Sequence, residues 1–115
     1  MPRAKRKAAT RVARTRLRAP ADPIELVLYV SASSRYALAA RRNCAAVLSS
    51  FDKSRLRFEV CDISREPERA EEDAVCYTPM LVKRRPLPRT CVLGDLSNSE
   101  ALVTLLRTCG LEPKR

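Results

Sequence analysis

The chain has 115 residues and a formal net charge of +10, and this length suits one domain rather than two. No apolar run reaches the roughly 18 residues that a bilayer-crossing helix needs, and no secretory h-region follows the basic start. We therefore expect a soluble, cytoplasmic protein. Histidine is absent, which removes the commonest metal ligand and the commonest general base near neutral pH.

The positive charge is concentrated at the N-terminus. Residues 1–22 hold eight Lys/Arg and one acid, whereas residues 23–115 hold fifteen bases and twelve acids. Because residues 1–22 contain few large apolar side chains, we predict a disordered basic arm ahead of a single domain over residues 23–115. Three interpretations of the arm stay open: a solvated tail, a weak contact with nucleic acid, and an organelle transit peptide.

The cysteines indicate neither a metal site nor a redox site. Their number is odd and no C-x-x-C spacing occurs, so zinc, another cofactor or a dithiol centre is not expected. Most lie in apolar runs, and we predict that most are buried core residues in a reducing compartment. The five are Cys44, Cys61, Cys76, Cys91 and Cys109.

The first half of the domain has the pattern of a β-α-β unit. Residues 24–30 are almost all apolar, as in a strand buried on both faces. The turn over residues 31–34 offers Ser33 or Ser34 as the N-cap of a helix. Apolar residues then recur at helical spacing from Ala37 to Phe51, and residues 56–61 alternate as in a half-buried strand. The two strands should be parallel, with a right-handed crossover.

The second half predicts a short helix, a hairpin and a last helix. An acidic helix opens at residues 64–68, and a strand follows the turn at Thr78-Pro79. Residues 84–88 are predicted to be a loop and residues 89–93 an antiparallel fourth strand. Ser97 and Glu100 have the spacing of a capping box ahead of the last helix, which should end near Gly110. The order β-α-β-α-β-β-α predicts a thioredoxin-like α/β fold with a mixed four-stranded sheet.

Several segments, in this order, resemble the KaiB family over about residues 24–107. They are Leu28-Tyr29-Val30, Ala70-Glu71-Glu72-Asp73, Thr78-Pro79-Met80-Leu81-Val82-Lys83, Pro86-Leu87-Pro88 and Gly94-Asp95-Leu96-Ser97. The chain departs from the family at Thr90-Cys91, where cyanobacterial members usually carry an arginine pair, and at Ala74, which replaces a usual lysine.

The resemblance implies a protein without catalytic activity that docks on a KaiC-type ATPase in circadian or stress signalling. It also implies a second half that can switch to another fold, a tetrameric form, and a cis-proline at Thr78-Pro79. An alternative hypothesis gives the module a different partner, a histidine kinase, with nucleic acid contacted by residues 1–22. A thioredoxin-like redox protein is disfavoured, because the turn that carries paired cysteines in thioredoxins is here Ser31-Ala32-Ser33-Ser34.

The candidate partner-binding residues form a basic cluster at the hairpin, with two acids as weaker candidates. Such a cluster could steer an acidic partner surface into place, or it could be a solvated charge run that protects an edge strand. The predicted partner-binding residues are Lys83, Arg84, Arg85, Arg89, Asp62 and Glu66.

Three residues are predicted to be critical for the fold: Pro79, Gly94 and Asp95. Pro79 is either a cis-proline that shapes a binding edge or simply the start of a strand. Gly94-Asp95 is either a switch position, since glycine accepts positive φ, or an ordinary strand-to-helix turn.

Overall fold

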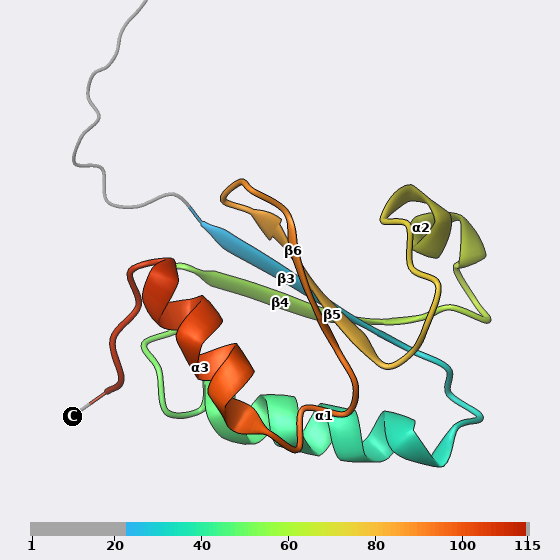
Figure 1. The fold of residues 1–115 in the computed structure, drawn as a ribbon, viewed down its shortest axis with the longest axis horizontal. Helices are drawn as coiled ribbons and strands as arrows, with labels where there is room; N and C mark the ends of the chain where they lie inside the picture. The colour runs from blue at the N-terminus through green and yellow to red at the C-terminus, as the bar shows by residue number, and fades with distance from the viewer. Residues whose placement is uncertain (1–22, 115) are drawn as a thin grey trace, which may run out of the picture.

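The computed structural model describes residues 23–114 (Figure 1). The predictions made for residues 1–22 therefore lie outside the described part of the chain. Figure 1 shows a sheet with α1 and α3 against one face and α2 against the other. The elements are β3 (Ile24–Val30), α1 (Arg35–Leu48), β4 (Leu56–Asp62), α2 (Pro67–Glu72), β5 (Met80–Arg85), β6 (Thr90–Leu93) and α3 (Ser99–Thr108).

The sheet has the predicted mixed topology, with strand order β4-β3-β5-β6. β3 pairs with β4 in parallel, so that Ile24 lies opposite Leu56 and Val30 opposite Asp62. β5 runs antiparallel to β3, and β6 runs antiparallel to β5. The predicted β-α-β unit and hairpin are therefore both confirmed, and β3 lies inside the sheet with neighbours on both sides.

Alternate side chains of β3 enter two separate apolar clusters, as the period of a strand requires. Leu26 and Leu28 point to the larger cluster, which contains buried residues of α1 and α3 such as Cys44 and Leu102. Val27 and Tyr29 point to the smaller cluster beneath α2. Burial on both faces explains why residues 24–30 are almost uniformly apolar.

The helix N-termini confirm one predicted cap and correct another. Ser34 is the N-cap of α1, and its Oγ accepts a hydrogen bond from the backbone N–H of Tyr36. The predicted Ser97–Glu100 capping box is wrong. Asn98 is the N-cap of α3, and its Oδ1 accepts from the backbone N–H of Glu100, because Ser97 is still part of a turn closed by Asp95 Oδ1.

The predicted loop over residues 84–88 begins too early. Arg84 and Arg85 belong to β5 rather than to a loop, since Arg85 still pairs with Glu25 across the sheet.

The expectation that most cysteines are buried is also wrong. Cys44 and Cys61 are buried, whereas Cys76 and Cys91 are exposed and Cys109 is half-buried. The run Cys91-Val92-Leu93 is apolar throughout, but a strand turns alternate residues to opposite faces, and one face of β6 is open.

These positions predict distinct thiol reactivities. Burial raises the pKa of the Cys44 thiol to about 12 and also raises the pKa of the Cys61 thiol. Both side chains should therefore react slowly with thiol reagents at pH 8, because the thiolate is the reacting form. Titration of the native protein with Ellman's reagent should show a fast phase from Cys76 and Cys91, with Cys44 and Cys61 reacting only in denaturant. The variant C76S/C91S should lose the fast phase, and a fast phase that survives would contradict this arrangement.

Candidate docking surface

A buried polar contact fixes α2 to the middle of the sheet. The hydroxyl of Tyr29, from the central strand, donates to Asp73 Oδ2 at the end of α2 at a distance of 2.5 Å. It also lies 3.3 Å from the backbone carbonyl oxygen of Arg69. Tyr29 is 1% exposed and Asp73 6%, so this hydrogen bond satisfies the hydroxyl and the Asp73 Oδ2 atom where water is largely excluded.

Two partly exposed arginines contact the other carboxylate oxygen of Asp73. Asp73 Oδ1 lies 3.5 Å from Nε of Arg84 and 4.0 Å from Nε of Arg89. On the other flank of α2, Arg69 donates two hydrogen bonds, of 2.6 and 2.9 Å, to the Glu59 carboxylate on β4. This pairing lowers the pKa of Glu59. The short helix is thus held at both flanks by ionic contacts.

α2 has only six residues, and it leaves part of its face of the sheet uncovered. Leu93, opposite Met80 in the hairpin register, is 59% exposed. Cys91, opposite Val82, is also exposed. Tyr77, in the turn before β5, is 70% exposed. We call Tyr77, Cys91 and Leu93, together with Arg84 and Arg89 beside them, the β6 surface.

The predicted basic cluster is divided between the two faces of the sheet. Lys83 is 4% exposed and stands opposite Leu26, on the α1 and α3 side, so it cannot contact a partner from this buried position. Arg84 and Arg89 turn toward Asp73 on the α2 side. Arg85 lines a hollow with Pro23 and Leu87 at the far end of the hairpin. Lys83 is buried, and Arg84 and Arg85 line different hollows, so the four bases do not form one surface.

The two acidic candidates lie at the other end of the sheet from Arg85. Asp62 is opposite Val30, and its Oδ1 accepts hydrogen bonds from the backbone N–H and the Oγ of Ser64, which lower the pKa of Asp62. Glu66 is the N-cap of α2 and lies 3.6 Å from Arg69. Both acids have local structural partners.

The three residues predicted to be fold-critical occupy turns. The Thr78-Pro79 peptide is cis, as are the bonds before Pro86 and Pro88. Gly94 has φ +98°, in the region that favours glycine, and its N–H donates to the Pro79 carbonyl oxygen at 2.9 Å. Asp95 accepts from the Ser97 N–H. Gly94-Asp95 is thus a strand-to-helix turn, and its role as a switch stays a prediction.

The position of the thioredoxin thiols is occupied by hydroxyl groups. Ser34 is engaged as the α1 N-cap, and the Oγ atoms of Ser31 and Ser33 lie 3.2 Å apart. Within residues 23–114 there is no group of three or more metal-ligating side chains. In the same range, no helix is long and apolar enough to cross a membrane.

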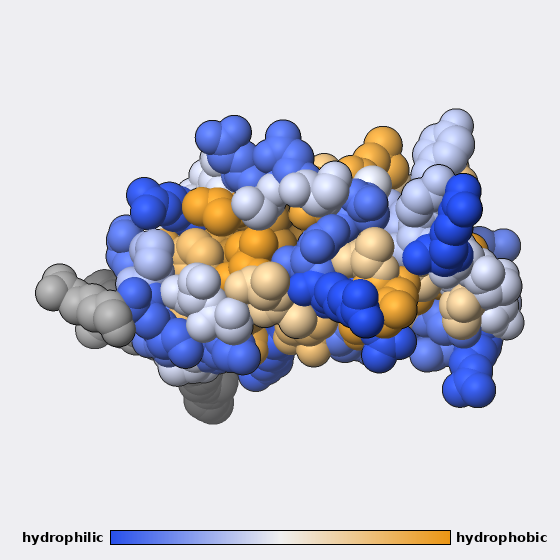
Figure 2. Space-filling view, turned by 90° about the horizontal axis from the view of Figure 1, so that it is seen from below, coloured by the Kyte–Doolittle hydropathy of each residue, from blue (hydrophilic) through white to orange (hydrophobic). Residues whose placement is uncertain are grey.

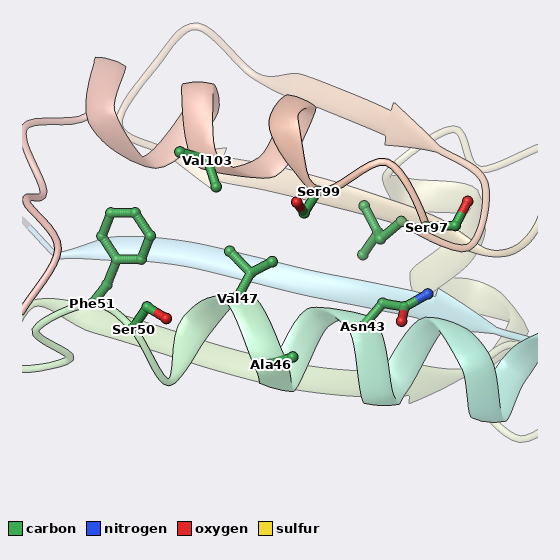
Figure 3. A pocket seen from close by; sticks show the side chains of 9 residues that line it. Asn43, Ala46, Val47, Ser50, Phe51, Ser97, Ser99 and Val103 are labelled. Atoms are coloured by element: carbon green, nitrogen blue, oxygen red, sulfur yellow. The ribbon is translucent and has the colours of Figure 1, made fainter.

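A hollow of about 320 Å³ lies between α1 and α3. In Figure 3, Val47 and Phe51 approach it from the α1 side and Val103 from α3, with Asn43 and Ser97 near one end. Figure 2 shows apolar residues on this side of the molecule, bordered by hydrophilic ones. The hollow contains no charged lining residue, and sequence reasoning did not identify it, because it depends on how two helices distant in sequence pack together.

The fold and the missing thiols define a class: a thioredoxin-like α/β domain without a dithiol site. The KaiB domain family matches residues 27–108, and this chain belongs to the KaiB family. It is 31% identical over 80 residues to circadian clock protein KaiB3 of Synechocystis sp., covering 70% of this chain and 78% of that protein. It is 33% identical over 78 residues to circadian clock oscillator protein KaiB of Thermostichus vulcanus, covering 68% and 72% respectively.

Solved structures agree on the fold. The N-terminal domain of Synechococcus elongatus SasA superimposes with a TM-score of 0.62 at 19% identity, covering 84% of this chain and 91% of that domain. Mitochondrial thioredoxin 3 of Saccharomyces cerevisiae gives a TM-score of 0.64 at 16% identity, covering 76% and 79%. The predicted thioredoxin-like fold and the predicted family are both confirmed.

The Tyr29–Asp73 contact predicts the effect of Tyr29→Phe. This change leaves a buried carboxylate without its hydroxyl donor, and it should lower the free energy of unfolding at pH 7 by about 1–3 kcal/mol. Urea denaturation followed by circular dichroism measures the difference. Tyr77→Phe, at an exposed tyrosine, is the control and should change it by less than about 0.5 kcal/mol.

The same contact predicts a pH dependence. Burial, followed by the hydrogen bond to Asp73, raises the pKa of Tyr29 above the ordinary value of 10.0. A raised pKa in the folded state stabilises the fold below pH 10 and loses this contribution as the pH rises further. The stability advantage of the natural protein over Tyr29→Phe should therefore shrink above pH 10. An advantage that stays constant to pH 11 would contradict the buried hydrogen bond.

Proposed function

We propose that this protein is a non-catalytic interaction module of clock-type signalling in the cytoplasm, and that its β6 surface docks on a KaiC-type ATPase. The observation that carries the proposal is the uncovered apolar strip beside α2. Tyr77 and Leu93 are both more than half exposed, and large side chains such as tyrosine are enriched at the centres of protein interfaces. Membership of the KaiB family supports a protein partner of this kind.

Charged side chains around the apolar strip support one defined orientation of this protein on its partner. Arg84 and Arg89 lie on one side of the strip, with side chains 41% and 38% exposed, and α2 itself carries exposed acids such as Glu68 and Glu72. An apolar centre with a charged rim resembles ordinary protein interfaces. Charges at the rim mainly set the association rate and the orientation of the complex.

The chemistry of the described residues supports a role without catalysis. Buried thiols with raised pKa values, such as Cys44 and Cys61, are poor nucleophiles. The serines at the thioredoxin position have no histidine to activate them, since the chain contains none. Affinity for the ATPase would depend on the population of the thioredoxin-like form, because the apparent Kd rises as the competent fraction falls.

Leu93→Asp tests the surface directly. It places a charge at the centre of the proposed interface and should weaken binding to purified cyanobacterial KaiC, in the presence of MgATP, by about tenfold or more. Biolayer interferometry with the full chain measures the dissociation constant. The reason is desolvation: an unpaired carboxylate would have to be buried against the partner.

The chain supplies a matched control. Leu38 on α1 is 56% exposed, against 59% for Leu93, but it belongs to a helix on the other side of the sheet. Leu38→Asp should change the dissociation constant by less than about twofold. Equal losses for both variants, or no binding of the natural chain, would refute docking through the β6 surface. Insulin reduction by the purified chain would refute the non-catalytic role.

A further inference from the structure

β4 forms an open edge of the sheet. In the strand order β4-β3-β5-β6, this strand has a hydrogen-bonded neighbour on one side only. It is seven residues long, contains no proline and pairs with β3 without a register shift. Short length, prolines and bulges are common devices that prevent an edge strand from pairing with another strand. β4 has none of these three, whereas β6, the other edge, has only four residues.

The unpaired backbone groups of this edge belong to Phe58 and Val60. Ile24 N–H donates to the Arg55 carbonyl oxygen at 2.8 Å, and this bond begins a parallel ladder in which the odd-numbered residues of β4 turn their N–H and C=O groups toward β3. Phe58 and Val60 lie between those residues and turn their own groups outward. Within residues 23–114, no backbone group outside the ladder bonds to them. The edge can therefore accept a further strand.

The two faces of β4 differ in chemistry. Leu56, Phe58 and Val60 are half-buried and pack against the apolar cluster of α1 and α3. Arg57 and Glu59 lie on the opposite face, the one that carries α2, and their side chains are 72% and 52% exposed. The strand thus presents a partly covered apolar row on one face and one base and one acid on the other.

This pattern is complementary to itself when two copies of β4 pair antiparallel. If Phe58 lies opposite Phe58 of a second copy, Arg57 lies opposite Glu59 and Leu56 lies opposite Val60. Phe58 N–H then donates to the Phe58 carbonyl oxygen across the pair, and Val60 N–H donates to the Leu56 carbonyl oxygen, each twice by symmetry. Opposite charges that face each other across antiparallel strands stabilise the pair.

Charge disfavours the neighbouring registers. A pair centred on Arg57 places this arginine against itself, and a pair centred on Glu59 does the same with the carboxylate. Like charges directly opposite each other destabilise paired strands. A pair centred on Val60 places Glu59 against the buried Cys61 and Arg57 against Ile63, beyond the end of the strand. Of these registers, only the one centred on Phe58 pairs both charges.

The existing contacts of the two charged side chains leave them available to a second copy. The contact of Arg57 with Glu25 is 4.0 Å long and exposed, and such a pair contributes little. Glu59 accepts two hydrogen bonds from Arg69. An ionised carboxylate has about four lone-pair sites, so Glu59 can also accept a hydrogen bond from Arg57 of a second copy.

We propose that this protein forms a symmetric homodimer by antiparallel pairing of two β4 strands, centred on Phe58. The two four-stranded sheets then form one continuous sheet, and the apolar row of each β4 is covered further by the row of the other. β6 is the opposite edge of each sheet. The dimer therefore leaves both β6 surfaces accessible, and the inference does not depend on what those surfaces bind.

Sedimentation equilibrium of the full chain tests the dimer, under reducing conditions so that the exposed Cys76 and Cys91 cannot cross-link. Arg57→Glu places carboxylates opposite each other at two symmetric positions and should raise the dimer dissociation constant about tenfold or more. The matched control is Arg85→Glu. Arg85 is exposed and flanks Glu25 from β5, as Arg57 does from β4, but β5 is not an edge. The control should change the dissociation constant by less than about twofold.

A second variant separates a lost interface from lost folding. Glu59→Arg should also weaken the dimer, because it places arginines opposite each other. An equal mixture of Glu59→Arg and Arg57→Glu should recover the dimer as a heterodimer, since each strand then presents the charge that the other lacks, and recovery requires both variants to be folded. In the natural chain, the amide protons of Phe58 and Val60 should exchange with solvent more slowly as the protein concentration rises through the dissociation constant.

Several results would overturn the proposal. They are a natural chain that stays monomeric up to about 100 μM, equal losses for Arg57→Glu and Arg85→Glu, and a mixture of the two complementary variants that does not associate. An oligomer that persists unchanged in Arg57→Glu would place the contact on another surface and would overturn the proposal as well.

Discussion

The structure depends on the burial of β3 on both faces. This strand lies between β4 and β5, and its alternate side chains enter two different apolar clusters. A strand of this kind is stable only when helices cover both sides of the sheet. α1 and α3 provide extensive cover on one side, whereas α2 provides six residues on the other. Because the cover is unequal, apolar side chains remain exposed on the face of the sheet that α2 covers.

The β6 surface is a direct consequence of the short α2. A longer helix would bury Leu93 and Cys91, as Val82 and Met80 are buried in the neighbouring strand. Because α2 buries little apolar area, polar contacts fix its position, chiefly Tyr29 with Asp73 and Arg69 with Glu59. Polar contacts of this type specify geometry more strictly than apolar packing does. A defined α2 in turn gives the adjoining surface a defined shape.

The sequence by itself determined the order of the elements, the parallel β-α-β unit, the hairpin and the family. These follow from local periodicity, from the apolar residues of β3 and from motifs such as Thr78-Pro79 and Gly94-Asp95, all of which are short-range signals. It also predicted Ser33 or Ser34 as a helix cap, and the structure has Ser34. It placed the α3 cap one residue early, because Ser97 and Asn98 are both competent caps and the Asp95 turn decides between them.

Only the tertiary structure decided which residues share a surface. The bases from Lys83 to Arg89 are close in sequence, yet Lys83 is buried, and Arg84 and Arg85 line different hollows. The partner of Tyr29 is 44 residues away along the chain, and the exposure of Cys91 and Leu93 depends on the length of another element. Burial depends on what packs against a residue, which is a long-range property that local pattern does not contain.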